Sequence, residues 1–423
     1  MAFQQGLSGL NATSKNLSVI GNNIANANTY GNKSSRAEFA DIYANAVNGS
    51  GSNGIGLGVN VTGVEQQFSQ GNITTTSNSL DLAINGNGFF QLANEGTTIY
   101  SRNGQFQKDK DGFIVNSSGN KLLGYAAGVD GTIIPSSVQA LKLPTGSIAP
   151  AATTGVALEM NLDSRQKITG PGATVPIDFA DAKTYNNATS ITVFDDKGQE
   201  IALTYYFQKT ADDTWDVYAT ANGMNLDGSD PKTTPPTPLI SGMAFAPNGG
   251  SLTNPAAPVS MDIGAVALST GGMSRPITGL QFDLKGATQY GSKFAVTNLS
   301  QDGYAPGDLT GVVIDKLGIV NAQYSNGLSK PAGQVVLATF NNPQGLQPLG
   351  GNVWASTHDS GAPVIGPAGQ GSIGTMQSGA LEESNVDLTA ELVNMIVAQR
   401  AYQANAQTIK TEDQLLQTLV NLR

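Results

Sequence analysis

The chain has 423 residues, of which 51 are Gly, 19 are Pro and only 13% are charged. This length gives room for two to four domains with apolar cores, and the composition favours turn-rich β structure over helical bundles. The formal net charge is −10, no basic residues cluster, and Cys is absent, so we expect no nucleic-acid partner, no disulfide, no thiolate catalysis and no metal held by Cys.

Residues 3–27 have the spacing of an amphipathic helix. Apolar or small side chains recur at intervals of four and three, at Phe3, Leu7, Leu10, Ser14, Leu17, Gly21 and Ile24. Gly21 costs a helix about 1 kcal/mol relative to Ala, so we do not expect this helix to be stable alone.

The N-terminus lacks the charged start and continuous apolar stretch of a cleaved signal peptide. No run of 18 or more apolar residues is available to cross a bilayer. We expect no membrane insertion and no Sec-type export.

Residues 29–72 are expected to connect this helix to β structure. Their centre is punctuated by Gly49, Gly51, Gly54, Gly56 and Gly58, which predicts a flexible turn or a strand edge. The Gly-rich run lacks the Lys-Ser/Thr ending of a phosphate-binding loop.

Residues 73–145 have the pattern of a β-meander. Leu80, Leu82 and Ile84 alternate, and Asn-Gly and Asp-Gly pairs then follow at short intervals. The run Asp109-Lys110-Asp111-Gly112 begins like a calcium loop, but no acidic residue follows at the required distance, so we interpret it as a hairpin turn.

Residues 146–303 differ in composition, being rich in Thr, Ala, Pro and Gly. We interpret them as a separate β domain. Residues 191–209 and 214–223 predict three antiparallel strands with a turn at Asp196-Lys197-Gly198. The Pro-rich residues 230–250 are expected to form a surface loop or a bulging connection. From Tyr304 onward the earlier β pattern returns, so one domain should be inserted in another.

Catalysis has little support in the sequence. The only histidine, His358, has Asp359 and Ser360 as its immediate neighbours, and residues consecutive in a chain rarely form a working triad. Glu382 and Glu383 stand just before a predicted helix, where capping and dipole interactions are favoured over acid-base chemistry. We expect no enzyme activity and no cofactor.

The C-terminal segment has the longest helical pattern. Its stripe runs through Leu388, Leu392, Met395, Gln399, Tyr402, Ala406, Ile409, Asp413, Leu416 and Val420, widened by Ile396 and Leu419. Ser384 and Asp387 resemble a helix cap. The pattern alone allows an antiparallel helix pair that closes a monomer or an interface between copies, and small residues in both stripes favour assembly.

Two terminal segments and four internal ones carry a family resemblance. LSGLNATSKNLSVIGNNIANANTYGNKSSRAEF (7–39) and SGALEESNVDLTAELVNMIVAQRAYQANAQTIKTEDQLLQTLVNLR (378–423) resemble the terminal signatures of the flagellar rod and hook protein family. GLGVNV (56–61), LDLAINGNGFFQL (80–92), YSRNGQFQKDKDG (100–112) and YAPGDLTG (304–311) are similar to its hook members. Asn32 stands where the family usually carries Phe, so packing by that ring is not expected here.

The resemblance implies a mainly β, multidomain subunit whose terminal helices form an inner coiled-coil layer. It implies a structural subunit of a curved tube of many copies, which acts as a universal joint transmitting torque from rod to filament for motility. Implied partners are a hook cap protein during assembly, the distal rod protein, a hook–filament junction protein and the flagellar type III export apparatus. The implied location is the extracellular flagellar hook of the basal body–hook complex.

The expected division is a terminal helical domain (1–28 with 386–423), a connector (29–72 with 373–385), an inner β domain (73–145 with 304–372) and an outer β domain (146–303). The expected assembly interface consists of Phe3, Leu7, Leu10, Leu17, Ile24, Leu388, Leu392, Met395, Ile396, Tyr402, Ile409, Leu416 and Val420. Two alternatives remain: a distal rod protein, or a secreted β-rich adhesin or enzyme. The 146–303 insertion and GLGVNV favour a hook subunit.

Overall fold

The computed structural model describes residues 2–42, 58–128, 131–169, 177–247, 250–268 and 271–421, with the side chains of residues 2, 42 and 419–421 left out. It is mostly β with one long helix at each end, which confirms the predicted fold class. The chain forms two compact units. The first contains Met1–Thr145, Gly311–Gln323 and Ser329–Arg423, and the second contains Gly146–Thr310 and Tyr324–Leu328.

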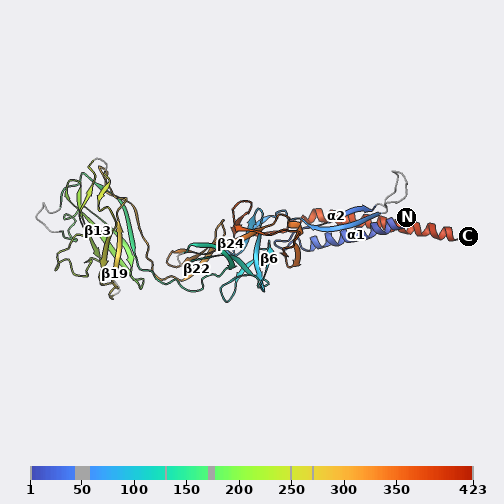
Figure 1. Cartoon of the computed structure of the whole chain (residues 1–423), viewed down its shortest axis with the longest axis horizontal. Coiled ribbons are helices and arrows are strands. Elements are labelled where there is room, and N and C mark those ends of the chain that lie inside the picture. The colour runs from blue at the N-terminus through green and yellow to red at the C-terminus, as the bar shows by residue number, and fades with distance from the viewer. Residues whose placement is uncertain are drawn as a thin grey trace. The chain divides into compact units, whose positions relative to one another are not determined.

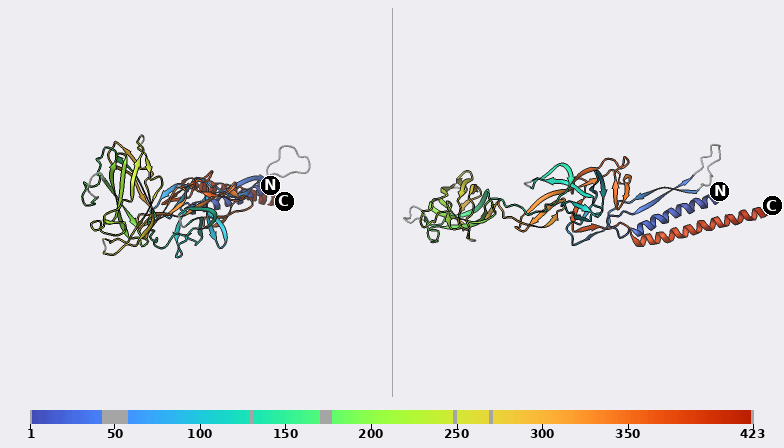
Figure 2. Two further views of the ribbon diagram at one scale, coloured as in Figure 1. Left: turned by 60° about the vertical axis from the view of Figure 1, so that its left-hand side comes forward. Right: turned by 90° about the horizontal axis from the view of Figure 1, so that it is seen from below.

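The terminal helices are α1 (Ala2–Ala25) and α2 (Leu388–Asn421), and they lie side by side (Figures 1 and 2). They are antiparallel, because Gly6 lies against Ile409 and Asn23 bonds to Glu391. Asp387 caps α2 as predicted: its Oδ1 accepts the N–H groups of Thr389 (2.9 Å) and Ala390 (3.1 Å). Neither helix is long and apolar enough to cross a membrane, among the residues described.

A two-stranded hairpin follows α1 and contacts it. It consists of β1 (Ser35–Ile42) and β2 (Gly58–Gln66), paired antiparallel, and both strands contact α1. The sequence predicts a turn or a strand edge in this connector, and the hairpin itself was not predicted. Residues 43–57, which hold four of the five glycines of the predicted Gly-rich turn, lie outside the described residues.

The main sheet of the first unit has twelve strands. Its central path is β22 (Leu309–Ile314), β23 (Ile319–Tyr324), β24 (Ser329–Thr339), β9 (Lys121–Ala127), β5 (Phe89–Asn94), β6 (Thr97–Ser101), β26 (Val353–Ala355) and β25 (Gln347–Gly350). Beside this path lie β7 (Phe106–Lys108), β8 (Ile114–Asn116), β10 (Ile133–Ala140) and β27 (Val364–Pro367), and the single 3-10 helix described is η1 (Pro343–Gly345).

The first unit also holds two short antiparallel pairs and two apolar clusters. One pair joins β4 (Leu82–Asn85) to β28 (Thr375–Ser378), and the other joins β3 (Ile73–Thr75) to β29 (Ala380–Glu382). The larger cluster includes Phe90, Leu92 and Leu122, while Phe89 and Trp354 belong to the smaller one. The β3–β29 pair fixes the segment that precedes α2 to the β structure.

The second unit contains two sheets around one apolar core that includes Trp215 and Phe282. The first sheet is formed by β18 (Val259–Ile263), β19 (Ile277–Asp283), β11 (Gly155–Asp163), β20 (Thr288–Tyr290) and β21 (Ala295–Gln301). The second is formed by β12 (Asn187–Phe194), β13 (Glu200–Ala211), β14 (Thr214–Ala221), β15 (Met224–Asn225), β16 (Ile240–Phe245) and β17 (Leu252–Asn254).

The three antiparallel strands predicted at 191–223 are confirmed as β12, β13 and β14, and Gly198 in the β12–β13 turn has a φ of +74°. The surface loop predicted at 230–250 is wrong in part. Its second half contains β16, in which Ile240, Met243 and Phe245 are buried and pairing with β14 is antiparallel. The strand was not predicted because the prolines on both sides of it indicate a loop.

The tip of the β23–β24 hairpin, Tyr324–Leu328, belongs to the second unit although the hairpin strands lie largely in the first. Ser325 exchanges hydrogen bonds with Asp308, and Asn326 Nδ2 donates to the carbonyl oxygen of Ala305 at 2.7 Å. The chain therefore passes between the units at four points, after residues 145, 310, 323 and 328.

Candidate assembly interface

The two terminal helices meet through small side chains. A Cβ built on Gly6 would lie 3.0 Å from Ile409 Cγ1, and one built on Gly9 would lie 2.8 Å from Asn405 Nδ2. Ala12, Ile20 and Ala398 are buried. Small residues thus allow α1 and α2 to approach closely along one face of each helix.

This pairing leaves much of the apolar surface of α2 uncovered. Residues 392–397 include Leu392, Val393, Ile396 and Val397, whose exposed fractions range from 49% to 61%. Further along, Leu415 and Leu416 are also exposed. A single chain therefore presents to solvent a contiguous row of side chains that normally belongs in a core.

The predicted interface residues fall into two groups in the single chain. Leu10, Leu17, Ile24, Met395 and Ile409 are half-buried, and of these Ile409 packs against Gly6 of α1. The exposed group consists of Phe3, Leu7, Leu388, Leu392, Ile396, Tyr402 and Leu416. Val420 lies in α2, but its side chain falls outside those described. The predicted interface omits Val393 and Val397, although both lie in LVNMIVA (392–398), an apolar run interrupted only by Asn394.

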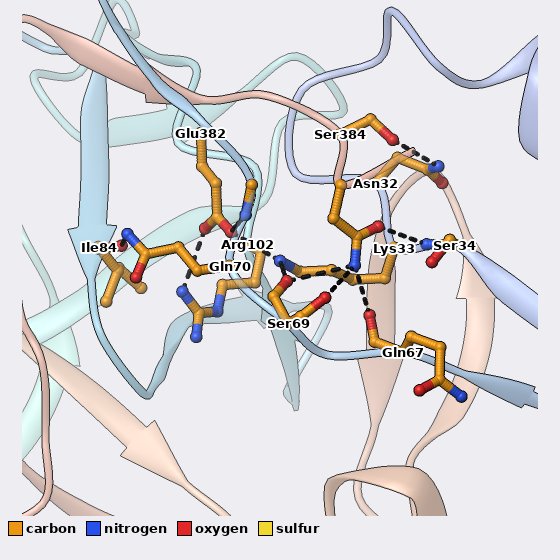
Figure 3. A network of polar contacts seen from close by, with 12 residues as sticks. Asn32, Lys33, Ser34, Gln67, Ser69, Gln70, Ile84, Arg102, Glu382 and Ser384 are labelled. Carbon is orange, nitrogen blue, oxygen red and sulfur yellow. Dashed lines mark hydrogen bonds and ion pairs between the residues drawn. The ribbon is translucent and has the colours of Figure 1, made fainter. Parts of the chain in front are cut away.

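A buried ion pair lies at the base of the helix pair. Lys33 Nζ, in the segment after α1, is 2.6 Å from Glu382 Oε1, at the end of β29, and both side chains are 0% exposed. Lys33 also donates to the carbonyl oxygen of Ser69 at 2.7 Å. Figure 3 shows these groups converging from three parts of the chain.

Arg102 completes the arrangement from the β structure. Its Nη1 donates to Glu382 Oε2 at 3.1 Å (Figure 3). Its Nη2 donates to the carbonyl oxygen of Gly86 at 2.8 Å, and its side chain is 4% exposed. The guanidinium also lies 5.4 Å from the centre of the Phe89 ring, a cation–π contact. Burial lowers the pKa values of Lys33 and Arg102, and the charge of Glu382 opposes that decrease in both cases.

Backbone groups tie the same junction together. Gly71 N–H donates to Glu382 Oε1 at 3.0 Å, and Gly31 N–H donates to the main-chain oxygen of Glu382 at 2.8 Å. Gly31 has a φ of +71°, and a Cβ there would overlap the backbone of Arg102 and Asn103. The turn after α1 can therefore approach the β structure only because residue 31 is glycine.

Two asparagines add hydrogen bonds across the junction. Asn385 Oδ1 accepts Ser34 N–H at 2.7 Å, while its Nδ2 donates to Gln67 O and Ser69 Oγ, each at 2.8 Å. Asn32 Nδ2 donates to Ser384 Oγ at 3.3 Å (Figure 3). Residue 32 thus contributes a polar contact to the junction.

The structure corrects the role predicted for Glu382. The sequence predicts a capping and helix-dipole role for Glu382, but its carboxylate is fully buried and paired with two cations, while Asp387 caps the helix. The hairpin turn predicted at Asp109–Gly112 is confirmed: Asp109 Oδ1 accepts the N–H groups of Asp111 and Phe113 between β7 and β8. His358 is exposed, and the neighbouring Ser360 hydroxyl donates to the main-chain oxygen of Thr357.

Four family models match successive parts of the chain. "Flagella basal body rod protein" matches residues 3–33, and "Flagellar hook protein FlgE/F/G D1 domain" matches residues 83–196. "Flagellar basal body protein FlaE D2 domain" matches residues 161–304, and "Flagellar basal body rod FlgEFG protein C-terminal" matches residues 377–422. Together with paired terminal helices that flank the β units in the chain, these matches define a structural subunit of the flagellar rod and hook class.

Relatives that match over the full length of the chain identify the family within this class. The chain is 43% identical over 429 residues to flagellar hook protein FlgE of Salmonella typhimurium strain LT2 and 44% identical over 430 residues to that of Escherichia coli K12, with 100% of each chain covered. The FlgE of Rhizobium meliloti is 36% identical, with 100% of this chain and 98% of that one covered. The chain belongs to the flagellar hook protein FlgE family, whose members are structural subunits of the bacterial flagellar hook.

A solved structure supports the fold. The flagellar hook protein FlgE2 of Helicobacter pylori aligns with a TM-score of 0.52 at 15% identity and covers 73% of this chain and 100% of that one. At this identity the likeness concerns the fold alone.

Proposed function

We propose that copies of this chain assemble into a curved, flexible tube through the exposed apolar face of the terminal helix pair, and that the tube acts as a universal joint transmitting torque from rod to filament. The observation that carries the proposal is the run of exposed side chains at 392–397, which α1 leaves uncovered. The predicted interface residues Phe3, Leu7, Leu388, Tyr402 and Leu416 lie outside the α1–α2 contact in the same way.

Physical estimates support assembly over a closed monomer. Burying apolar surface contributes about 25 cal/mol per Å², so each of these half-exposed side chains would add on the order of 1 kcal/mol when a neighbour covers it. Several such side chains per copy, repeated along a polymer, would hold the inner layer together. The more polar β units would supply weaker contacts that adjust as the tube bends.

The finer partners follow from the same proposal. Assembly would take place under a hook cap protein, with the distal rod protein at one end and a hook–filament junction protein at the other. Export would use the flagellar type III apparatus and deliver the chain to the extracellular hook without a cleaved signal peptide.

The proposal is tested by changing the uncovered face and imaging the product. Leu392→Asp combined with Ile396→Asp places two charges in the interface and should abolish tubes in electron micrographs. The matched control, Leu392→Met with Ile396→Leu, keeps the volume and the apolar character and should assemble. Both variants should retain the thermal unfolding of the β units, since neither residue belongs to a described core cluster.

Deleting residues 388–423 provides the complementary test. The β units should keep their circular dichroism spectrum while sedimentation shows monomers only. Tubes formed by the shortened chain, or by the double Asp variant, would disprove assembly through the helix pair.

A further inference from the structure

Lys33, Arg102 and Glu382 meet at the base of the helix pair, and they differ in how many charged partners each has. Glu382 has two cations beside it, Lys33 at 2.6 Å and Arg102 at 3.1 Å. Lys33 has a single charged partner, Glu382, and one carbonyl acceptor, Ser69. Arg102 has a second contact in Gly86 and lies by the Phe89 ring. The junction therefore depends on Glu382 more than on either cation.

The three side chains also belong to segments that can dock separately. Lys33 follows α1, Glu382 precedes α2, and Arg102 directly follows β6 of the main sheet. The Glu382 segment has its own attachment, because β29 pairs with β3 and Glu383 N–H donates to Asn72 O at 2.8 Å. With the Glu382 segment in place and residues 31–34 undocked, the carboxylate would still pair with Arg102.

The reverse order is unfavourable. If residues 31–34 docked first, the Lys33 ammonium would enter a fully buried position with only the Ser69 carbonyl to accept from it. An unpaired buried charge is strongly destabilising. The lowered pKa of Lys33, for which burial is the main cause, reflects the same loss of solvation.

We propose that Lys33 is a gate that makes docking of the N-terminal segment conditional on prior docking of Glu382. The two residues are separated by 349 positions in the chain. The last part of the chain must therefore be present before the first part can settle onto the β structure. A truncated or incompletely delivered chain would keep α1 undocked and would not present a complete helix pair.

Hydrogen exchange on the soluble full chain tests this order. Gly31 N–H and Gln67 N–H report docking of the N-terminal segment, because they bond to Glu382 O and Ser34 O; Glu383 N–H reports docking of the C-terminal segment. Glu382→Gln should speed exchange at Gly31 and Gln67 by roughly 150- to 5,000-fold, the size expected when one partner of a buried ion pair is removed.

A second substitution, which removes the charge of Lys33, tests whether that charge causes the effect of Glu382→Gln. Lys33→Met fills a similar volume without needing an anion, so Glu382→Gln combined with Lys33→Met should restore most of the protection at Gly31 and Gln67. Lys33→Met alone should leave Glu383 protected. The matched control is Arg36→Met, which removes a nearby cation whose ion pair with Glu38 is exposed; it should not rescue Glu382→Gln.

Three results would overturn the proposal: unprotected Gly31 and Gln67 in the wild-type chain, unchanged exchange in Glu382→Gln, or no rescue by Lys33→Met. If Glu382→Gln fails to fold, Glu382→Asp, which withdraws the carboxylate by one methylene, is measured in both backgrounds with the same expected rescue. Tube formation is scored separately, so failure of the gate and failure of assembly are distinguishable.

Discussion

Gly6 of α1 faces Ile409 of α2 so closely that a Cβ on the glycine would lie 3.0 Å from Ile409 Cγ1. At this distance, position 6 of α1 can carry only the hydrogen of a glycine unless Ile409 moves. The spacing of the helix pair is therefore set at this point by the absence of a side chain on Gly6.

Gly6→Leu should separate the helices and reduce assembly. The leucine side chain cannot fit beside Ile409, so α1 must shift or detach, at a cost of about 1–3 kcal/mol for overpacking. Sedimentation of assembly reactions should show a higher critical concentration, by roughly 5- to 150-fold for that energy.

Gly21→Ala is the matched control, because it alters another glycine of α1 at which a Cβ would meet nothing within 4 Å. It should raise helix stability by up to about 1 kcal/mol and leave the tubes intact. A normal critical concentration for Gly6→Leu would contradict the close-packing interpretation.

The helices of the unassembled chain should exchange their amide hydrogens quickly. Phe3 and Leu7 are exposed and α1 contains Gly6, Gly9 and Gly21, so packing against α2 is its main support. Hydrogen exchange with mass spectrometry should find residues 3–27 far less protected than the core strand β5 in monomer, and protected in tubes. Strong protection of 3–27 in monomer would refute this prediction.

In the second unit, the ion pair between Asp163 and Arg165 should persist in acid to about pH 2. Hydrogen bonds from Arg165 hold the pKa of Asp163 at about 2, below the ordinary value of 3.8. A lowered carboxylate pKa stabilises the fold above the ordinary value, and this contribution is lost as pH falls from about 3.8 through about 2. Carbon-detected NMR should place the Asp163 titration near pH 2, and Arg165→Ala should raise it. A titration near 4 in the unaltered chain would contradict the prediction.

Local chemistry made much of the fold predictable. The spacing of apolar residues predicted both helices, and Asp387 marked the start of α2 because an Asp side chain caps the first N–H groups. The turn at Asp109–Gly112 and the strands around Gly198 follow from Asp-Gly and Lys-Gly sequences, whose glycines adopt positive φ. These features depend on residues close together in the chain.

The junction could not be predicted in the same way. Lys33 and Glu382 carry charges that suit a solvated surface, and only the folded chain shows that both are buried. Glu382 directly follows Leu381 in a three-residue strand, a weak signal that β structure extends up to the helix. The uncovered face at 392–397 was partly predicted through Leu392 and Ile396, whereas the expected stripe did not include Val393 and Val397. Its role in assembly stays a prediction, as does the finer division into domains.

The hairpin tip at Tyr324–Leu328 limits how this protein can be rebuilt or recombined. Asn326 and Ser325 bond to main-chain atoms of Ala305 and Asp308, so replacing residues 146–310 as one cassette keeps these bonds only where the donor's main chain follows the same path. A chimaera that exchanges the second unit is therefore expected to fold best when residues 324–328 come from the same donor. Recombination between relatives that transfers the larger segment alone would leave a mismatched tip, so the two segments are expected to change together.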